Sequence, residues 1–142
     1  MAGVPRVVAS GELVARVDGI AVHLLTVEAW AGRVAVRAVG VPDDDALAAM
    51  RAHEVAMAEW YTSAAAAGTR PPRSPADVTL EAVRVQAEQG GVPLRPVAWS
   101  HGGTGTEWLG QWVFEAGLPT GMVRIVVEAG DDRWSETLDL TA

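Results

Sequence analysis

The chain has 142 residues, of which 49% are hydrophobic and 20% are charged, and its formal net charge at pH 7 is -7. This length fits a single domain, residues 1–142, with one core, and the composition is too apolar for a disordered protein. The negative charge argues against nucleic acid and anionic membrane surfaces as partners, because both attract clustered cations. The absence of cysteine excludes disulfides, thiolate metal sites and a cysteine nucleophile.

No segment of the sequence predicts membrane insertion. The first ten residues lack the cationic start and continuous apolar core of a signal peptide. No apolar run approaches the roughly 20 residues that span a bilayer. We therefore expect a cytoplasmic protein, although a leader removed from the N-terminus would leave no trace in this sequence.

The first forty residues contain short apolar runs separated by turn residues, which predicts a meander of antiparallel strands. Asp18-Gly19 and Ala31-Gly32 are turn dipeptides. Pro5 has no N–H to donate to a neighbouring strand, which favours an edge position for the first segment. The predicted strands are residues 4–8 and 13–17, which form two short strands or one broken strand, followed by 20–28 and 34–41.

A long helix is predicted next, over about residues 44–66. Pro42 and three carboxylates from Asp43 onward precede an uninterrupted run without glycine or proline, which is typical of a helix N-terminus. Gly68 and the prolines that follow end the helix, and we expect an extended, exposed linker up to Pro75. Apolar side chains at three- and four-residue spacing should pack this helix on the rest of the domain: Leu47, Met50, Met57 and Trp60.

Period-two alternation returns in the second half of the chain. The most informative stretch is residues 106–119, where Trp108, Gly110, Trp112 and Phe114 share one strand face and predict an inner strand. A glycine-rich loop, residues 100–106, precedes it. Strands are also predicted around residues 83–88, 94–99, 123–127 and 134–140, which gives seven to nine strands in all.

These elements predict a mainly β protein, an immunoglobulin-like antiparallel β-sandwich with one helical insertion at about residues 44–66. The order of an apolar hairpin, a helix and a strand block that contains Trp108, Trp112 and Phe114 resembles uncharacterised bacterial immunoglobulin-like proteins of actinobacterial type. The resemblance covers mainly residues 76–128. It implies the sandwich fold and brings no known activity with it.

No arrangement of residues in the sequence specifies a reaction. His23, His53 and His101 lack the spacing of metal ligands, so no metal or cofactor is expected. No serine lies in a nucleophile elbow, and the neighbours Ser100 and His101 would point apart on a strand. We therefore expect a protein that is not an enzyme.

Two non-catalytic functions remain open from the sequence, beside a third reading as an enzyme of unknown type. The first is a non-catalytic immunoglobulin-like module that contacts a protein partner or has a structural role, with its oligomeric state undecided. The alternative is a β-sandwich that binds a small molecule or carbohydrate. In either case the expected contact surface is the glycine-rich loop with its flanking aromatic residues, although Trp108 is also a candidate for the core. The candidate binding residues are Trp99, His101, Gly102, Gly103, Thr104 and Trp108.

Overall fold

The computed structural model describes residues 6–63, 68–103, 108–116 and 121–140. Within these ranges the chain forms ten strands and two helices, and neither helix is long and apolar enough to cross a membrane. The elements are β1 (Arg6–Ala9), β2 (Leu13–Val17), β3 (Ile20–Trp30), β4 (Arg33–Val41), α1 (Asp44–Thr62), α2 (Pro75–Glu81), β5 (Arg84–Gln89), β6 (Val92–Pro93), β7 (Arg95–Gly103), β8 (Trp108–Glu115), β9 (Met122–Ala129) and β10 (Asp132–Asp139).

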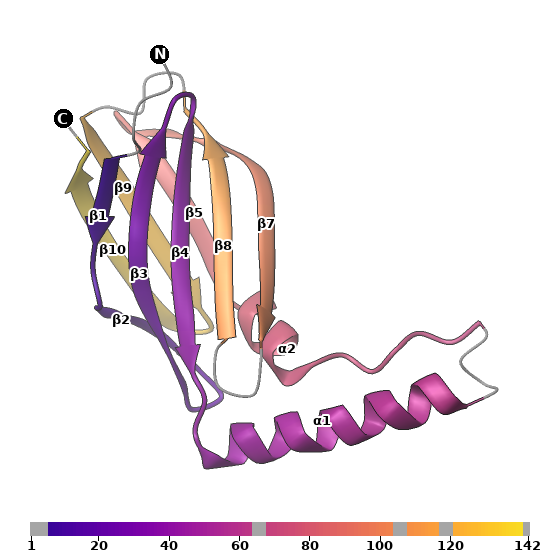
Figure 1. Ribbon diagram of the computed structural model, residues 1–142. Coiled ribbons are helices and arrows are strands. Elements are labelled where there is room, and N and C mark those ends of the chain that lie inside the picture. Colours follow the sequence, from indigo (N-terminus) through magenta and orange to yellow (C-terminus); the bar gives the residue numbers. More distant parts are fainter. Residues whose placement is uncertain (1–5, 64–67, 104–107, 117–120, 141–142) are drawn as a thin grey trace.

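The strands form two antiparallel sheets that face each other (Figure 1). The six-stranded sheet has the order β1-β3-β4-β8-β7, with β2 also paired to β3. The four-stranded sheet has the order β10-β9-β5-β6. The mainly β sandwich with a helical insertion is therefore confirmed. β1 and β2 both pair with β3, one after the other, and so form the broken edge strand that the sequence predicts.

The main core lies between the two sheets and follows the alternation of the strands. β3 and β4 bury every second residue over most of their length, as the burial of Val34 and Val36 shows. On β8, Phe114 is buried in this core, whereas Leu109, on the opposite face, is exposed. The shared inward face of Trp108, Gly110 and Phe114 is confirmed, and Trp112 is half-buried against the same core.

Helix α1 begins where the sequence predicts, because the Asp43 side chain accepts a hydrogen bond of 2.8 Å from the Ala46 N–H. Its first half packs on the end of the sandwich through Ala46 and Met50. The expectation that the whole helix lies on the sandwich is wrong, since its second half extends past the sheets (Figure 1). There the indole N–H of Trp60 donates to Oγ1 of Thr69, in the segment that follows the helix.

A second helix, α2, corrects the prediction of a single helical insertion. Ser74 caps it by accepting a hydrogen bond of 3.0 Å from the Asp77 N–H, and Pro75 occupies the first turn, where its missing N–H costs no hydrogen bond. α2 joins α1 and the ends of β3 and β8 in a second core. This second core consists of Ile20, Ala46, Met50, Ala76, Leu80 and Trp108.

Candidate functional site

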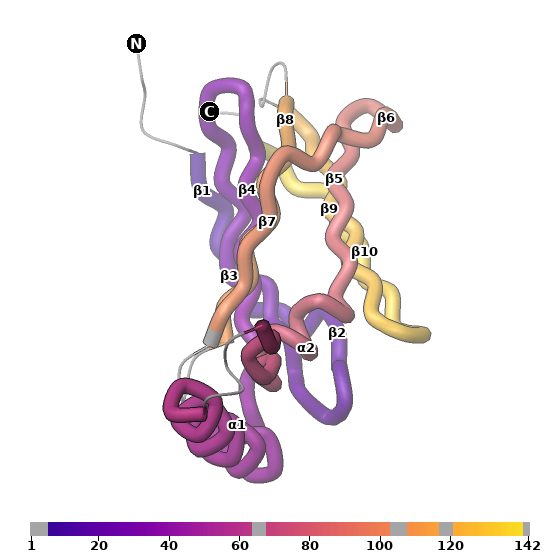
Figure 2. Tube along the Cα trace, turned by 90° about the vertical axis from the view of Figure 1, so that its right-hand side faces the viewer, coloured from indigo at the N-terminus to yellow at the C-terminus, as the bar shows by residue number. Residues whose placement is uncertain are grey.

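The two sheets separate along one side of the sandwich, between β5 and β7. β5 turns back into β6, and the chain then crosses to the other sheet, where β7 pairs with β8. The crossing is held to β5 by a hydrogen bond of 2.8 Å from the Leu94 N–H to the Ala87 carbonyl. Figure 2 shows β5 and β7 on opposite sides, joined near β6 at one end and with α2 at the other.

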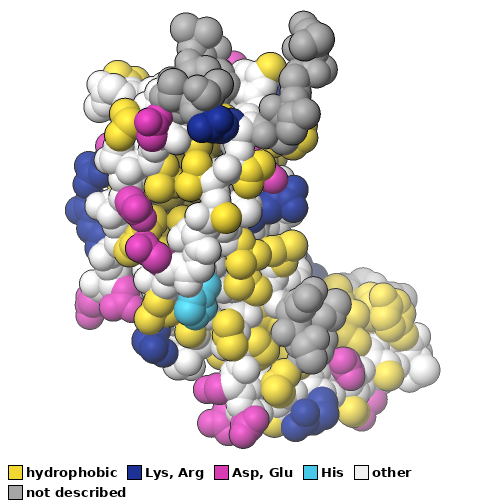
Figure 3. Space-filling view, turned by 60° about the vertical axis from the view of Figure 1, so that its left-hand side comes forward, with side chains coloured by type: hydrophobic (Ala, Val, Ile, Leu, Met, Phe, Trp, Pro, Cys, Tyr) yellow, Lys and Arg dark blue, Asp and Glu magenta, His cyan; other side chains and the backbone are white. Residues whose placement is uncertain are grey.

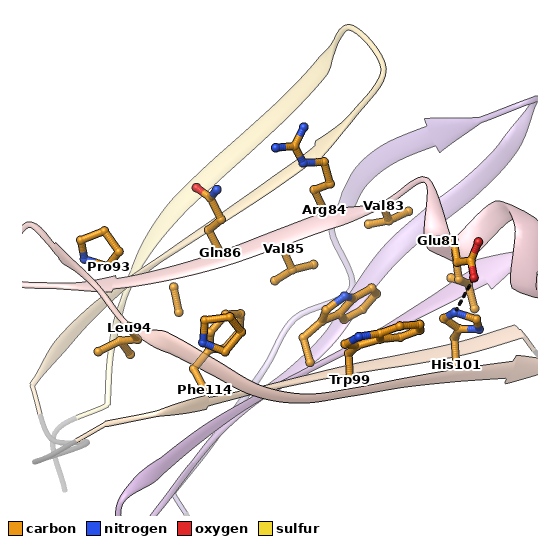
Figure 4. Close-up of a pocket in the computed structure, with 14 residues that line it drawn as sticks. Glu81, Val83, Arg84, Val85, Gln86, Pro93, Leu94, Trp99, His101 and Phe114 are labelled. Atoms are coloured by element: carbon orange, nitrogen blue, oxygen red, sulfur yellow. Dashed lines mark ion pairs between the residues drawn. The ribbon is translucent and has the colours of Figure 1, made fainter.

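Side chains line a groove of about 610 Å³ in this space (Figure 4). Its walls come from both sheets, with Val85 on β5 and with Trp112 and Phe114 on β8, and Leu94 lies at the crossing. The groove is therefore mainly apolar, with a few polar groups. The complete lining is Leu80, Glu81, Val83, Arg84, Val85, Gln86, Ala87, Pro93, Leu94, Pro96, Trp99, His101, Trp112 and Phe114.

β7 supplies two rings to the groove, those of Trp99 and His101. The register between β7 and β8 shifts between Pro96 and Ala98, which changes the face on which the following side chains of β7 lie. After the shift, Trp99 pairs with Trp112 and His101 pairs with Gly110. The two rings are stacked, with centroids 4.8 Å apart and planes at 29°. Trp99 is 61% exposed and forms an open aromatic face at the side of the groove.

His101 is the buried polar residue of the groove, with a side chain that is only 10% exposed. Its Nδ1 lies 2.8 Å from Oδ1 of Asp77 on α2. An ionised carboxylate only accepts hydrogen bonds, so the Nδ1 of a neutral imidazole carries the proton here. Nε2 is then a hydrogen-bond acceptor, and it is buried without a hydrogen-bond partner in the described part of the chain.

Glu81, one helical turn after Asp77, faces the other side of the same ring. Its Oε1 lies 4.0 Å from Nε2 of His101, which is too long for a hydrogen bond. Its second oxygen, Oε2, accepts from the guanidinium of Arg73. The two carboxylates thus lie against different ring nitrogens rather than around one point, and no group of three acidic or histidine side chains among the described residues could hold a metal ion.

An ion pair connects β7 to β8 at the crossing end of the groove. Arg95 donates to Oε2 of Glu115 through Nε, at 2.9 Å, and through its terminal nitrogen. The hydrogen bond from Arg95 lowers the pKa of the Glu115 carboxyl, and the positive charges of Arg95 and Arg33 act in the same direction.

Only some of the binding residues predicted from the sequence lie at the groove. Trp99 and His101 both line the groove, and Gly102 and Gly103 end β7 beside them. Thr104 lies outside the described residues. Trp108 does not line the groove, because it is buried in the second core and only 1% exposed.

The sequence predicted no helix at Pro75–Glu81, so the contribution of α2 to the groove emerges only from the structure. Asp77 and Glu81 are four residues apart, which places them on one face of a helix. A short sequence pattern could have predicted that helix, namely Ser74-Pro-Ala-Asp77. It contains a capping serine, a proline in the first turn and an acidic residue at the third helical position.

The groove is suited to binding, with flat rings for stacking, aliphatic walls and a polar end. The described side chains that line it include no hydroxyl or thiol. No protein-family model, curated protein or solved structure matches the chain.

Proposed function

We propose that the protein binds a small, largely apolar molecule in the groove between β5 and β7, without acting as an enzyme. The observation that carries this proposal is the groove itself, whose volume of about 610 Å³ is within the usual range for ligand sites. Its composition supports the same function, because aromatic and aliphatic walls surround a few polar groups. In this proposal the sandwich is of the bacterial immunoglobulin-like kind and the protein is cytoplasmic.

The exposed indole of Trp99 is a surface on which a flat ligand can stack. Trp99 exposes most of its surface although it is large and apolar, and its partner His101 holds one face of the indole in place. A ligand that covers the exposed surface of Trp99 removes apolar area from water, at roughly 25 cal/mol per Å². An aromatic or fused-ring body is therefore the expected ligand type.

Titration with 2-naphthylmethanol, followed by amide and indole NMR shifts, tests this proposal. We expect shifts at the Trp99 indole and at Val85, which lie in the two walls. Val85→Trp fills the groove and should abolish these shifts, whereas Val92→Trp, at an exposed position outside the groove lining, should retain them. Shifts located elsewhere, or equal binding by both variants, would disprove the proposal.

A second candidate is contact with a protein partner through the outer face of the six-stranded sheet. Leu25, Val41 and Leu109 are large apolar side chains exposed there. Figure 3, which brings the β1 and β10 side of the molecule forward, shows hydrophobic side chains at the surface between charged ones. Two ion pairs, Arg37–Glu28 and Arg95–Glu115, compensate charges on this outer face.

Because the exposed apolar side chains of this face lie near charges that are paired with each other, like charges do not oppose self-association there, and we propose a second copy of the chain as the partner. Light scattering after size exclusion measures the mass. The wild type should be a dimer and Leu109→Arg a monomer with unchanged circular dichroism. A wild-type monomer at high micromolar concentration would disprove this second proposal.

A further inference from the structure

The polar end of the groove presents two hydrogen-bond acceptors that face each other. One is Nε2 of His101, which is buried and has no partner among the described residues, and the other is Oε1 of Glu81, at 4.0 Å. Figure 4 shows these two side chains facing each other at the end of the groove, with Trp99 beside His101. Burial of an unsatisfied acceptor is unfavourable, so a donor between these atoms would stabilise the site.

The distance between the acceptors restricts the kind of donor. One nitrogen atom placed about 2.9 Å from both acceptors can bridge them if it carries at least two hydrogens. A hydroxyl group has one hydrogen and can donate to only one of the two acceptors. A carboxylate has none and would face the negative charge of Glu81 at close range.

The existing contacts of the two carboxylates leave this position open. Oε2 of Glu81 binds Arg73, so Oε1 is the oxygen that faces His101. Asp77 binds Nδ1 and thereby keeps Nε2 of the neutral ring as an acceptor. The arrangement thus orients one carboxylate oxygen and one ring nitrogen toward a common point.

Charge and aromatic surface favour a cation at this point. Glu81 and Asp77 contribute two negative charges beside the ring, of which Arg73 compensates one, and the indole of Trp99, stacked on His101, adds π electrons close to this point. The net charge of the chain, -7, also attracts cationic ligands over longer distances.

We propose that the end of the groove at α2 binds a primary ammonium group, which donates to Nε2 of His101 and Oε1 of Glu81, while the apolar body of the same ligand occupies the groove. The ligand class is therefore an aromatic or fused-ring primary amine. This inference rests on the proposed function of the groove and adds the chemical group that the ligand must carry.

Four probes that share one ring system and differ in one substituent test the inference by calorimetry at pH 7.5. They are 2-naphthylmethylamine, 2-naphthylmethanol, 2-methylnaphthalene and 2-naphthoate. The amine should bind about tenfold more tightly than the alcohol, as expected for charge-assisted hydrogen bonds, and the carboxylate should bind most weakly. Equal affinity of the amine and the alcohol would overturn the inference and leave the proposed function standing, whereas no binding of any probe would end the proposed function.

Two charge-matched variants show whether the preference for the amine comes from the ammonium site or from the overall negative charge of the protein. Glu81→Gln should reduce the preference for the amine over the alcohol to less than about threefold. Glu59→Gln makes the same charge change at an exposed position on α1 and should keep the full preference. An equal preference in both variants would overturn the inference, because it would assign the selectivity to overall charge. His101→Phe, which keeps a ring against Trp99, should also lose the preference.

Discussion

The indole of Trp112 lies against Gly110, two residues earlier on β8, so closely that a Cβ at Gly110 would lie 2.5 Å from Cη2 of the ring. Glycine is therefore required at this position for the ring to cover the strand and form part of the groove wall. Gly110→Ala should displace the indole and destabilise the protein by about 1–3 kcal/mol in urea unfolding. Gly102→Ala is the matched control on β7, since its added Cβ would meet no atom within 4 Å. Equal stability of the two variants would contradict this account of Trp112.

Trp108 is expected to hold both helices to the end of the sandwich. Trp108→Ala should reduce the free energy of unfolding by about 3–5 kcal/mol, because it removes a large ring from the second core. Trp108→Phe should be much less destabilising, since the indole N–H of Trp108 has no hydrogen-bond partner among the described residues. Urea unfolding gives both values, and a cost below about 1 kcal/mol for Trp108→Ala would show that α2 is held by other contacts.

Ser74 should be required for α2 to form a stable end of the groove. Ser74→Ala removes the oxygen that accepts from the Asp77 N–H and should cost about 1 kcal/mol. Ser74→Asp, which keeps an acceptor, should restore the stability. Hydrogen exchange of the α2 amides is the direct measurement, and unchanged protection in Ser74→Ala would argue against the cap.

The Arg95–Glu115 pair predicts a measurable pKa shift. In a carbon-detected NMR titration, the pKa of Glu115 should lie below its ordinary value of 4.5, because Arg95 stabilises the ionised carboxylate. In Arg95→Gln the value should return toward 4.5. The pair therefore favours the folded state above pH 4.5, and this contribution is lost as the pH falls through the lowered pKa of the folded state. An identical pKa in the two proteins would contradict the ion pair.

Glu136 on β10 should have the opposite pH dependence. Desolvation raises its pKa above 4.5, and the neighbouring carboxylate of Glu12 adds to the effect. The folded state then binds the proton more tightly than the unfolded chain, so stability falls as the pH rises from about 4.5 through the raised pKa. Glu136→Gln should remove this fall. Melting temperatures of both proteins between pH 4 and pH 7 test it, and parallel curves would show that Glu136 is not shifted.

The sheets could be predicted from the sequence because their signals are local. Alternation along β8 and the Asp18-Gly19 turn each depend on neighbouring residues, and both turn residues have the positive φ that such a turn requires, 50° and 82°. The start of α1 is equally local, since Asp43 caps it three residues before Ala46. Such features need no knowledge of the rest of the fold.

The groove could be predicted only in part, because it depends on residues that are distant in the chain. The sequence identifies Trp99 and His101 as candidate binding residues, but it predicts His101 in a loop, whereas β7 continues through His101 to Gly103. Asp77, however, precedes His101 by 24 residues, and the docking of α2 brings them together. α2 itself is seven residues long and follows several prolines, so it shows too little periodicity to be distinguished from an extended linker.

Helix α2, at the polar end of the groove, is joined directly to β5, which forms one of its walls. Only Ala82 and Val83 separate the two elements, and the Val83 N–H is bonded to the Leu80 carbonyl at 3.1 Å. A ligand that tilts α2 would therefore also pull the first residue of β5, Arg84, which pairs with Glu128 on β9. Occupation of the groove would therefore act through this short connection on β9, the strand that pairs with β5.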